Sequence, residues 1–217
     1  MWWNMERDMK QQFEDWHSHE HFPERLGIPG FLRSSRWTAA DGGEGVFVMY
    51  ELENFDVLAS EPYLARLNAP TPWSTKLMPF HRDMVRCQSH VLESSGGCVA
   101  RQALTVRLAP ASGREAELQS WLKTLAVRLA ATPGFAGAHL LRHETPSIAR
   151  TKEQMIRGAS DRIADWVFVV CAYEPESLAS LAGTELSNAS LASQGAAGET
   201  FAATYALSYS AVRSDTV

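Results

Sequence analysis

Hydrophobic and polar side chains alternate through much of the second half of the chain. Over residues 102–108 the alternation has a period of two, which predicts a strand. Apolar residues then recur at helical spacing over residues 118–129, which predicts an amphipathic helix that ends at Pro133-Gly134. Further strands are expected at residues 135–141, 166–172 and 201–209, with a helix over 177–191. The predicted order is β-α-β-β-α-β, the split βαβ pattern of a ferredoxin-like unit.

The first half of the chain is predicted to have the same order of elements, although its periodic patterns are shorter. Met9, Phe13 and Trp16 begin a helical stripe after a very short strand at residues 2–5. The remaining elements are predicted as strands at residues 30–37, 46–52 and 85–92 and a broken helix at 55–67. The chain is therefore predicted to be α+β, with two tandem ferredoxin-like units.

A short motif that occurs twice supports a repeat. Pro29-Gly30-Phe31 recurs as Pro133-Gly134-Phe135, each time after a helical pattern that contains a tryptophan. Ser94-Ser95-Gly96-Gly97 is the expected linker. We therefore predict a first unit at residues 1–94, which carries the site, and a mainly structural second unit at 98–217. The units differ in the link at residues 142–165, which is long, charged and expected to contain a small helix.

A four-stranded sheet with helices on one face must bury its other face. Two units in one chain can pair sheet to sheet, which predicts either an internally paired monomer or a homodimer. In that arrangement the two sheets pack face to face.

The amino-acid composition argues against several classes of protein. The chain has 217 residues, of which 45% are hydrophobic and 21% charged, so a disordered chain is not expected. The net charge is −5 and no basic block is present, which argues against a nucleic-acid partner. Three cysteines without a CxxC pair favour a reducing compartment. Without a long apolar run or a secretory signal pattern, we expect a cytoplasmic protein with no membrane partner.

One carboxylate interrupts the stripe of the first helix. Advancing 100° per residue, Glu20 falls on the face of Phe13 and Trp16, with His17 at its edge. Burial raises the pKa of a carboxylate, and a carboxylate tuned upward beside an imidazole suits proton abstraction near neutral pH. In the second unit Leu125 takes the matching position, so the fold does not require a carboxylate there. This difference favours a function for the polar cluster.

The end of this helix allows a structural alternative. Pro23 disfavours helix at Phe22, so the helix is expected to end there, with Glu24-Arg25 in the following turn. Glu20 would then pair with Arg25 as a clamp at the helix end.

His17 and His21 are four residues apart, a spacing that suits two metal ligands on one helix face. A clear third ligand is missing, so we predict no metal. Haem would need an axial ligand such as His139 or His143, but no local pattern selects either residue. We accordingly expect no cofactor.

Aromatic residues of the first unit suit the wall of a pocket for a small apolar ligand. Core packing is the alternative for each of them. The candidate ligand-binding residues are Trp37, Tyr50, Trp73 and His81.

The stretch 16–33, with Glu20-His21-Phe22-Pro23-Glu24-Arg25 followed by Pro29-Gly30-Phe31, resembles the helix-to-strand passage of EthD-like proteins. The resemblance implies the dimeric α+β barrel superfamily. That superfamily includes cofactor-free monooxygenases, muconolactone-type isomerases, polyketide cyclases and haem-binding members. The chain departs from single-copy members in being duplicated, and a fold shared by so many reactions constrains architecture more than chemistry.

These features predict a cofactor-independent acid/base enzyme for a small aromatic or lactone-like metabolite. It would act as an isomerase, lyase, cyclase or monooxygenase-like catalyst. Glu20 with His21 or His17 would be the acid/base pair, and Arg25 would orient Glu20 or an anionic substrate. The alternatives are a non-catalytic binding or assembly protein of the same fold, or a haem- or metal-binding member.

Overall fold

Each half of the chain forms an antiparallel sheet with the same spatial order of strands. The computed structural model describes residues 1–158 and 161–216. In the first half the order is β4-β1-β3-β2, and in the second it is β9-β6-β8-β7, with β5 added beyond β7. The strands are β1 (Trp2–Met5), β2 (Phe31–Ala39), β3 (Gly45–Leu52), β4 (His81–Val85), β5 (Ser89–Gly96), β6 (Gln102–Pro110), β7 (Phe135–His143), β8 (Trp166–Ala172) and β9 (Ala196–Val212). This order is that of a ferredoxin-like unit, as predicted.

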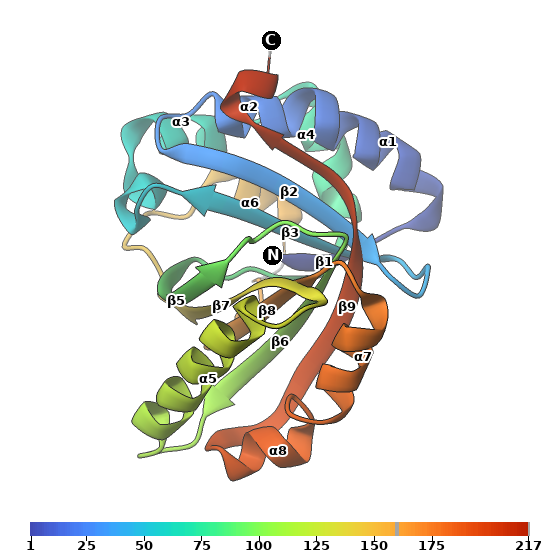
Figure 1. Cartoon of the computed structure of the whole chain (residues 1–217). Coiled ribbons are helices and arrows are strands. Elements are labelled where there is room, and N and C mark those ends of the chain that lie inside the picture. The colour runs from blue at the N-terminus through green and yellow to red at the C-terminus, as the bar shows by residue number, and fades with distance from the viewer. Residues whose placement is uncertain (159–160, 217) are drawn as a thin grey trace.

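The helices fill the outer layers, those of the first half on one side and most of those of the second half on the other (Figure 1). They are α1 (Lys10–Trp16), α2 (Phe22–Leu26), α3 (Glu61–Asn68), α4 (Pro72–Leu77), α5 (Glu115–Ala130), α6 (Lys152–Arg157), α7 (Pro175–Gly183) and α8 (Asn188–Ser193). None of the described helices is long and apolar enough to cross a membrane.

Two long segments join the sheets at both edges. The first part of β9 pairs with β6, and its last part pairs with β2 of the other half (Figure 1). The segment 81–96 does the same from the first half, because β4 pairs with β1 and β5 pairs with β7. The nine-stranded sheet is therefore closed into an α+β barrel within one chain.

The inner faces of the two sheets pack against each other. Trp37 and Phe47 of the first half share one buried cluster with Val167, Val169 and Cys171 of the second half. Burial of this apolar surface is the main force that holds the halves together. The predicted face-to-face packing of two ferredoxin-like sheets is confirmed.

The repeated Pro-Gly-Phe has a steric cause in each half. Gly30 has a φ of 89° and Gly134 a φ of 96°, a region that L side chains rarely adopt. A Cβ at Gly30 would lie 2.4 Å from Val57 Cγ2, and a Cβ at Gly134 would lie 2.5 Å from Ser177 Oγ. The glycine thus lets the turn before the second strand of each unit approach the unit's second helical segment.

Two predicted boundaries are wrong. Ser94–Gly96 is not a linker but the end of β5, paired with residues 137–139 of β7. Small side chains do not weaken this ladder, because main-chain groups form it. The strand predicted at 85–92 is also two strands, since the chain leaves β4 after Val85 and joins β7 from Ser89.

Candidate functional site

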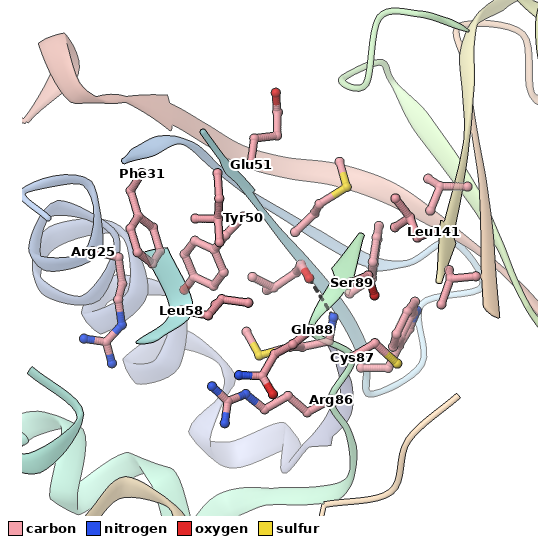
Figure 2. Close-up of a pocket in the computed structure, with 18 of the residues that line it drawn as sticks. Arg25, Phe31, Tyr50, Glu51, Leu58, Arg86, Cys87, Gln88, Ser89 and Leu141 are labelled. Carbon is pink, nitrogen blue, oxygen red and sulfur yellow. Dashed lines mark hydrogen bonds between the residues drawn. The ribbon is translucent and has the colours of Figure 1, made fainter. Parts of the chain in front are cut away.

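A cavity of about 620 Å³ opens beside the helix that follows β1 and extends past β3 toward the second half. Aromatic and aliphatic side chains make up most of its wall. Side chains on both faces of β3 contribute, with Tyr50 toward the helices and Met49 toward the inner face of the barrel. Figure 2 shows Arg25, Phe31 and Tyr50 on one side of it, with Cys87, Ser89 and Leu141 on the other.

A π-helical turn at His17–His21 lies beside this cavity. The Phe22 N–H donates to the His17 carbonyl, five residues back, instead of four. The wider turn accommodates Pro23 inside a continuing helix, because the ring needs no acceptor and the i−4 carbonyl is displaced from its usual place. The helix therefore continues through α2, and the expectation that it ends at Phe22 with Glu24-Arg25 in a turn is wrong.

His17 and His21 are both buried, and both line the cavity. Their rings are stacked with centroids 5.3 Å apart. Among the described residues, neither His17 Nδ1 nor His21 Nδ1 has a hydrogen-bond partner.

Burial keeps these imidazoles neutral. The pKa of His17 lies well below the usual 6.5 because burial disfavours the cation, and the nearby charge of Arg36 disfavours it further. The pKa of His21 is lowered in the same way by burial and by the nearby charge of Arg25. At neutral pH both rings have an unprotonated nitrogen, as a general base requires.

His81 and Tyr50 are two further polar residues of the wall. His81 Nδ1 lies 3.2 Å and 3.1 Å from the carbonyls of Leu77 and Met78, and burial lowers the pKa of His81 to about 4. The Tyr50 hydroxyl is buried without a partner among the described residues. Burial raises the pKa of Tyr50 above its usual value, so the hydroxyl keeps its proton and is a hydrogen-bond donor.

Arg25 joins the two halves at the cavity wall. Its guanidinium donates to Glu153 Oε1 at 2.5 Å and to Glu24 Oε2 at 3.0 Å. Burial is the largest single influence and lowers the pKa of Arg25, but the nearby Glu153, Tyr63 and Glu24 together outweigh it, so the pKa of Arg25 is raised. Glu153 belongs to α6, in the long link of the second half, so this half supplies a buried carboxylate to the cavity of the first.

Glu20 lies outside the residues that line the cavity. Its Oε1 accepts hydrogen bonds from Trp16 Nε1 at 3.0 Å and from Thr71 Oγ1 at 2.5 Å. Thr71 caps α4, so Glu20 connects the first helix to the loop before α4. It is half-buried, and Arg25 pairs with other carboxylates. The clamp is therefore made with Thr71 and not with Arg25.

The structure brings together five of the eight residues singled out in the sequence. His17, His21, Arg25, Tyr50 and His81 line the same cavity. The other three lie elsewhere. Trp37 is fully buried between the sheets and stacks on Phe47, Trp73 packs in the layer between helices and sheet, and Glu20 holds the loop before α4.

Sequence reasoning did not identify several residues of the wall. Glu153 and Arg157 come from α6, and Arg86 and Gln88 come from the passage between β4 and β5. The length and charge of the link at 142–165 were a signal that this segment has a role. Nothing in the sequence indicates which half it covers.

The histidines offer no evident metal or haem site. Among the described residues no group of three or more His, Cys, Asp or Glu side chains is placed to hold a metal ion. Both ring nitrogens of His139 contact protein, Nδ1 with Ser94 Oγ at 2.9 Å and Nε2 with the Gly97 carbonyl at 3.3 Å. His143 is likewise engaged by Gln88 and Thr145.

No protein-family model and no curated protein sequence matches the chain. Several solved structures resemble it over nearly its whole length. An anthrone oxidase-like protein is 14% identical with a TM-score of 0.61, and the match covers 100% of this chain and 92% of that one. A proposed monooxygenase of Fusobacterium nucleatum subsp. nucleatum is 7% identical with a TM-score of 0.63, and 98% of this chain and 92% of that one are covered.

A proposed monooxygenase of Lactobacillus acidophilus is 9% identical with a TM-score of 0.58, and 98% of this chain and 93% of that one are covered. At such identities the likeness establishes the fold, and it does not single out EthD-like proteins. The chain therefore has a ferredoxin-like α+β barrel fold, with both halves of the barrel in one polypeptide.

Proposed function

We propose that this protein is a cofactor-independent acid/base enzyme that removes a proton from a small aromatic metabolite. The observation that carries the proposal is the pair of buried, neutral imidazoles of His17 and His21, which have unpartnered Nδ1 atoms and face an aromatic cavity. An unpartnered buried polar atom is costly, and a bound ligand with a matching group would remove that cost.

The wall supports proton abstraction in two ways. A neutral imidazole can accept the proton, because one of its ring nitrogens is unprotonated at neutral pH. The protonated Tyr50 hydroxyl is a donor for the oxygen on which negative charge develops after deprotonation. Glu20 keeps its clamp role in this proposal, so the base is assigned to the imidazoles and not to Glu20.

The similar structures favour an oxygenase within this class. Their names include an anthrone oxidase-like protein and two proposed monooxygenases. A deprotonated aromatic ketone or phenol is electron-rich and reacts with molecular oxygen without a bound cofactor. Isomerase, lyase or cyclase chemistry would begin from the same proton transfer. The EthD-like passage at 16–33 supports membership of that family within the superfamily.

Isotope exchange separates the proton transfer from any later step. Anthrone and a panel of lactones would be incubated with the protein in D₂O without oxygen, and loss of the acidic C–H signal followed by proton NMR. We expect catalysed exchange that falls by about 10²-fold or more in His17→Gln and His21→Gln, because a positioned base contributes that much. In air, the exchanging compound should also consume oxygen.

Glu20→Gln is the matched control, since it changes a polar residue of the same turn that does not line the cavity. The exchange rate of this variant should stay within about threefold of the wild-type rate, a much smaller change than the loss of a positioned base would cause. Exchange no faster than in buffer for every compound would contradict the enzyme assignment. Binding without exchange would favour the alternative, a small-molecule-binding protein of the same fold.

A further inference from the structure

We propose that Arg86 and Gln88 form a carboxylate-binding subsite in this cavity, so that the ligand is an aromatic acid. The inference rests on the proposed function for the aromatic part of the ligand and adds the group that orients it. Both residues lie in the irregular passage between β4 and β5, and both line the cavity.

Arg86 differs from the other arginines of the wall in its charge balance. Arg25 pairs with Glu24 and Glu153, and Arg157 pairs with Glu153 and Asp161. Within residues 1–158 and 161–216, by contrast, the side chain of Arg86 contacts no carboxylate. Its NH2 donates to the Tyr63 hydroxyl at 3.0 Å, a neutral partner.

A guanidinium group in a mainly apolar cavity is stabilised when an anion binds next to it. Guanidinium groups remain charged at all ordinary pH values, and a charge that is partly removed from water is stabilised by an opposite charge nearby. One NH2 contact with Tyr63 leaves further N–H donors of the planar fork free. A carboxylate fits such a fork with two parallel hydrogen bonds.

Gln88 supplies a second, independent indication. Its Nε2 is buried and has no hydrogen-bond partner among the described residues. Figure 2 shows the Gln88 amide and the Arg86 guanidinium close together, extending to the same side. The main chain of Gln88 is held by His143, because the backbone N–H of Gln88 donates a hydrogen bond of 3.1 Å to His143 Nδ1. The two donors therefore come from one short passage of backbone, two residues apart, and both line the cavity.

The subsite also fits the rest of the wall. The aromatic rings of Phe31 and Tyr50 stand across the cavity from this passage (Figure 2). A ligand whose carboxylate is held at Arg86 and Gln88 would have its ring system against these aromatic side chains.

Calorimetric titration with two ligands of nearly the same shape tests the subsite. 2-Naphthoate carries the carboxylate, and 2-naphthylmethanol replaces it with a neutral alcohol. We expect the wild-type protein to bind the acid about 10- to 100-fold more tightly, because hydrogen bonds to a charged group are worth that much. Arg86→Met should remove this preference and leave the alcohol within about twofold. Gln88→Leu should reduce the preference by a smaller factor.

Arg82→Met is the matched control, because Arg82 lies four residues earlier and is exposed beside Glu44. It should bind both ligands like the wild type, and thermal melts would confirm that each variant is folded. Equal affinity of the wild type for the two ligands, no binding of either, or an equal loss of both in Arg86→Met would overturn the subsite. The His17 and His21 variants should retain 2-naphthoate binding, so failure of the subsite and failure of the proposed base are distinguishable.

Discussion

At the scale of single residues, the cavity is defined by polar groups that the fold leaves without partners. His17, His21 and Tyr50 all have buried polar atoms that no described side chain or main-chain group satisfies. Such groups are rare in stable proteins, where most buried donors and acceptors are paired. A bound ligand with matching groups would satisfy the three that face the cavity.

The buried histidines make stability depend on pH in a defined direction. Their folded pKa values lie below the unfolded value of 6.5, so the unfolded chain binds more protons as pH falls. Stability should be complete above about pH 6.5 and decline below it, by at most about 1.4 kcal/mol per pH unit for each histidine. Urea unfolding at pH 7.5, 6 and 5 would measure the slope.

His17→Phe provides the comparison for this slope, since aromatic side chains surround the ring and phenylalanine does not titrate. The variant should lose stability less steeply between pH 6.5 and 5. Parallel pH curves for the two proteins would show that His17 does not contribute.

The clamp at Glu20 predicts a loss of stability without a loss of ligand. Glu20→Leu removes the acceptor for Trp16 Nε1 and Thr71 Oγ1 and should cost about 1–3 kcal/mol. Glu20→Gln keeps an acceptor oxygen and should cost less. Chemical denaturation measures both, and 2-naphthoate affinity should stay near the wild-type value. A large loss of 2-naphthoate affinity in Glu20→Leu with unchanged stability would show that Glu20 contributes to ligand binding and not to the clamp.

At the scale of elements, the turn glycines predict matched effects in the two halves. Gly30→Ala and Gly134→Ala each add a Cβ in a positive-φ position and against a neighbour within 2.5 Å, so each should cost about 2–4 kcal/mol. Gly113→Ala has the same backbone strain but open space around it, and should cost about 1 kcal/mol. Denaturant midpoints would rank them, and equal losses in all three would exclude the steric explanation.

Most elements could be predicted from local sequence, and the exceptions have physical causes. Period-two alternation located β6, and the continuous apolar run located β8, because burial on one or both faces leaves that pattern. The π-helical turn was missed because a periodicity of 100° per residue assumes an unbroken α-helix. The same periodicity did not distinguish Glu20, which lies outside the cavity wall, from His17 and His21, which line it.

At the scale of the whole molecule, α6 is the element that couples the halves at the cavity. Local pattern predicted a helix in this link, but its position over the first half depends on the buried pair of Glu153 with Arg25, two residues far apart in sequence. Such pairings leave no periodic signal in a single sequence. The same reason explains why Arg86 and Gln88 could not be assigned to the cavity in advance.

Breaking this pair should loosen α6 more than any surface pair would loosen its surroundings. Glu153→Ala leaves the buried Arg25 with Glu24 alone and should cost about 3–5 kcal/mol. Amide exchange over residues 152–157 should rise in the same variant. Glu117→Gln, which disrupts an exposed pair with Arg114, should change neither quantity measurably. Unchanged exchange in α6 would show that other contacts hold it.

Closure of the barrel within one chain has a consequence for symmetry. In a symmetric dimer of two identical subunits, every feature occurs twice. An α6 that packs on the other subunit would therefore be matched by a second α6 on the symmetry-related side of the barrel. Because both halves belong to one polypeptide here, their sequences can differ, and a feature can be present in one half only. The covalent link also fixes the effective concentration of one half around the other, so dilution cannot separate Glu153 from Arg25. The cavity is thereby free to be asymmetric and remains assembled at any protein concentration.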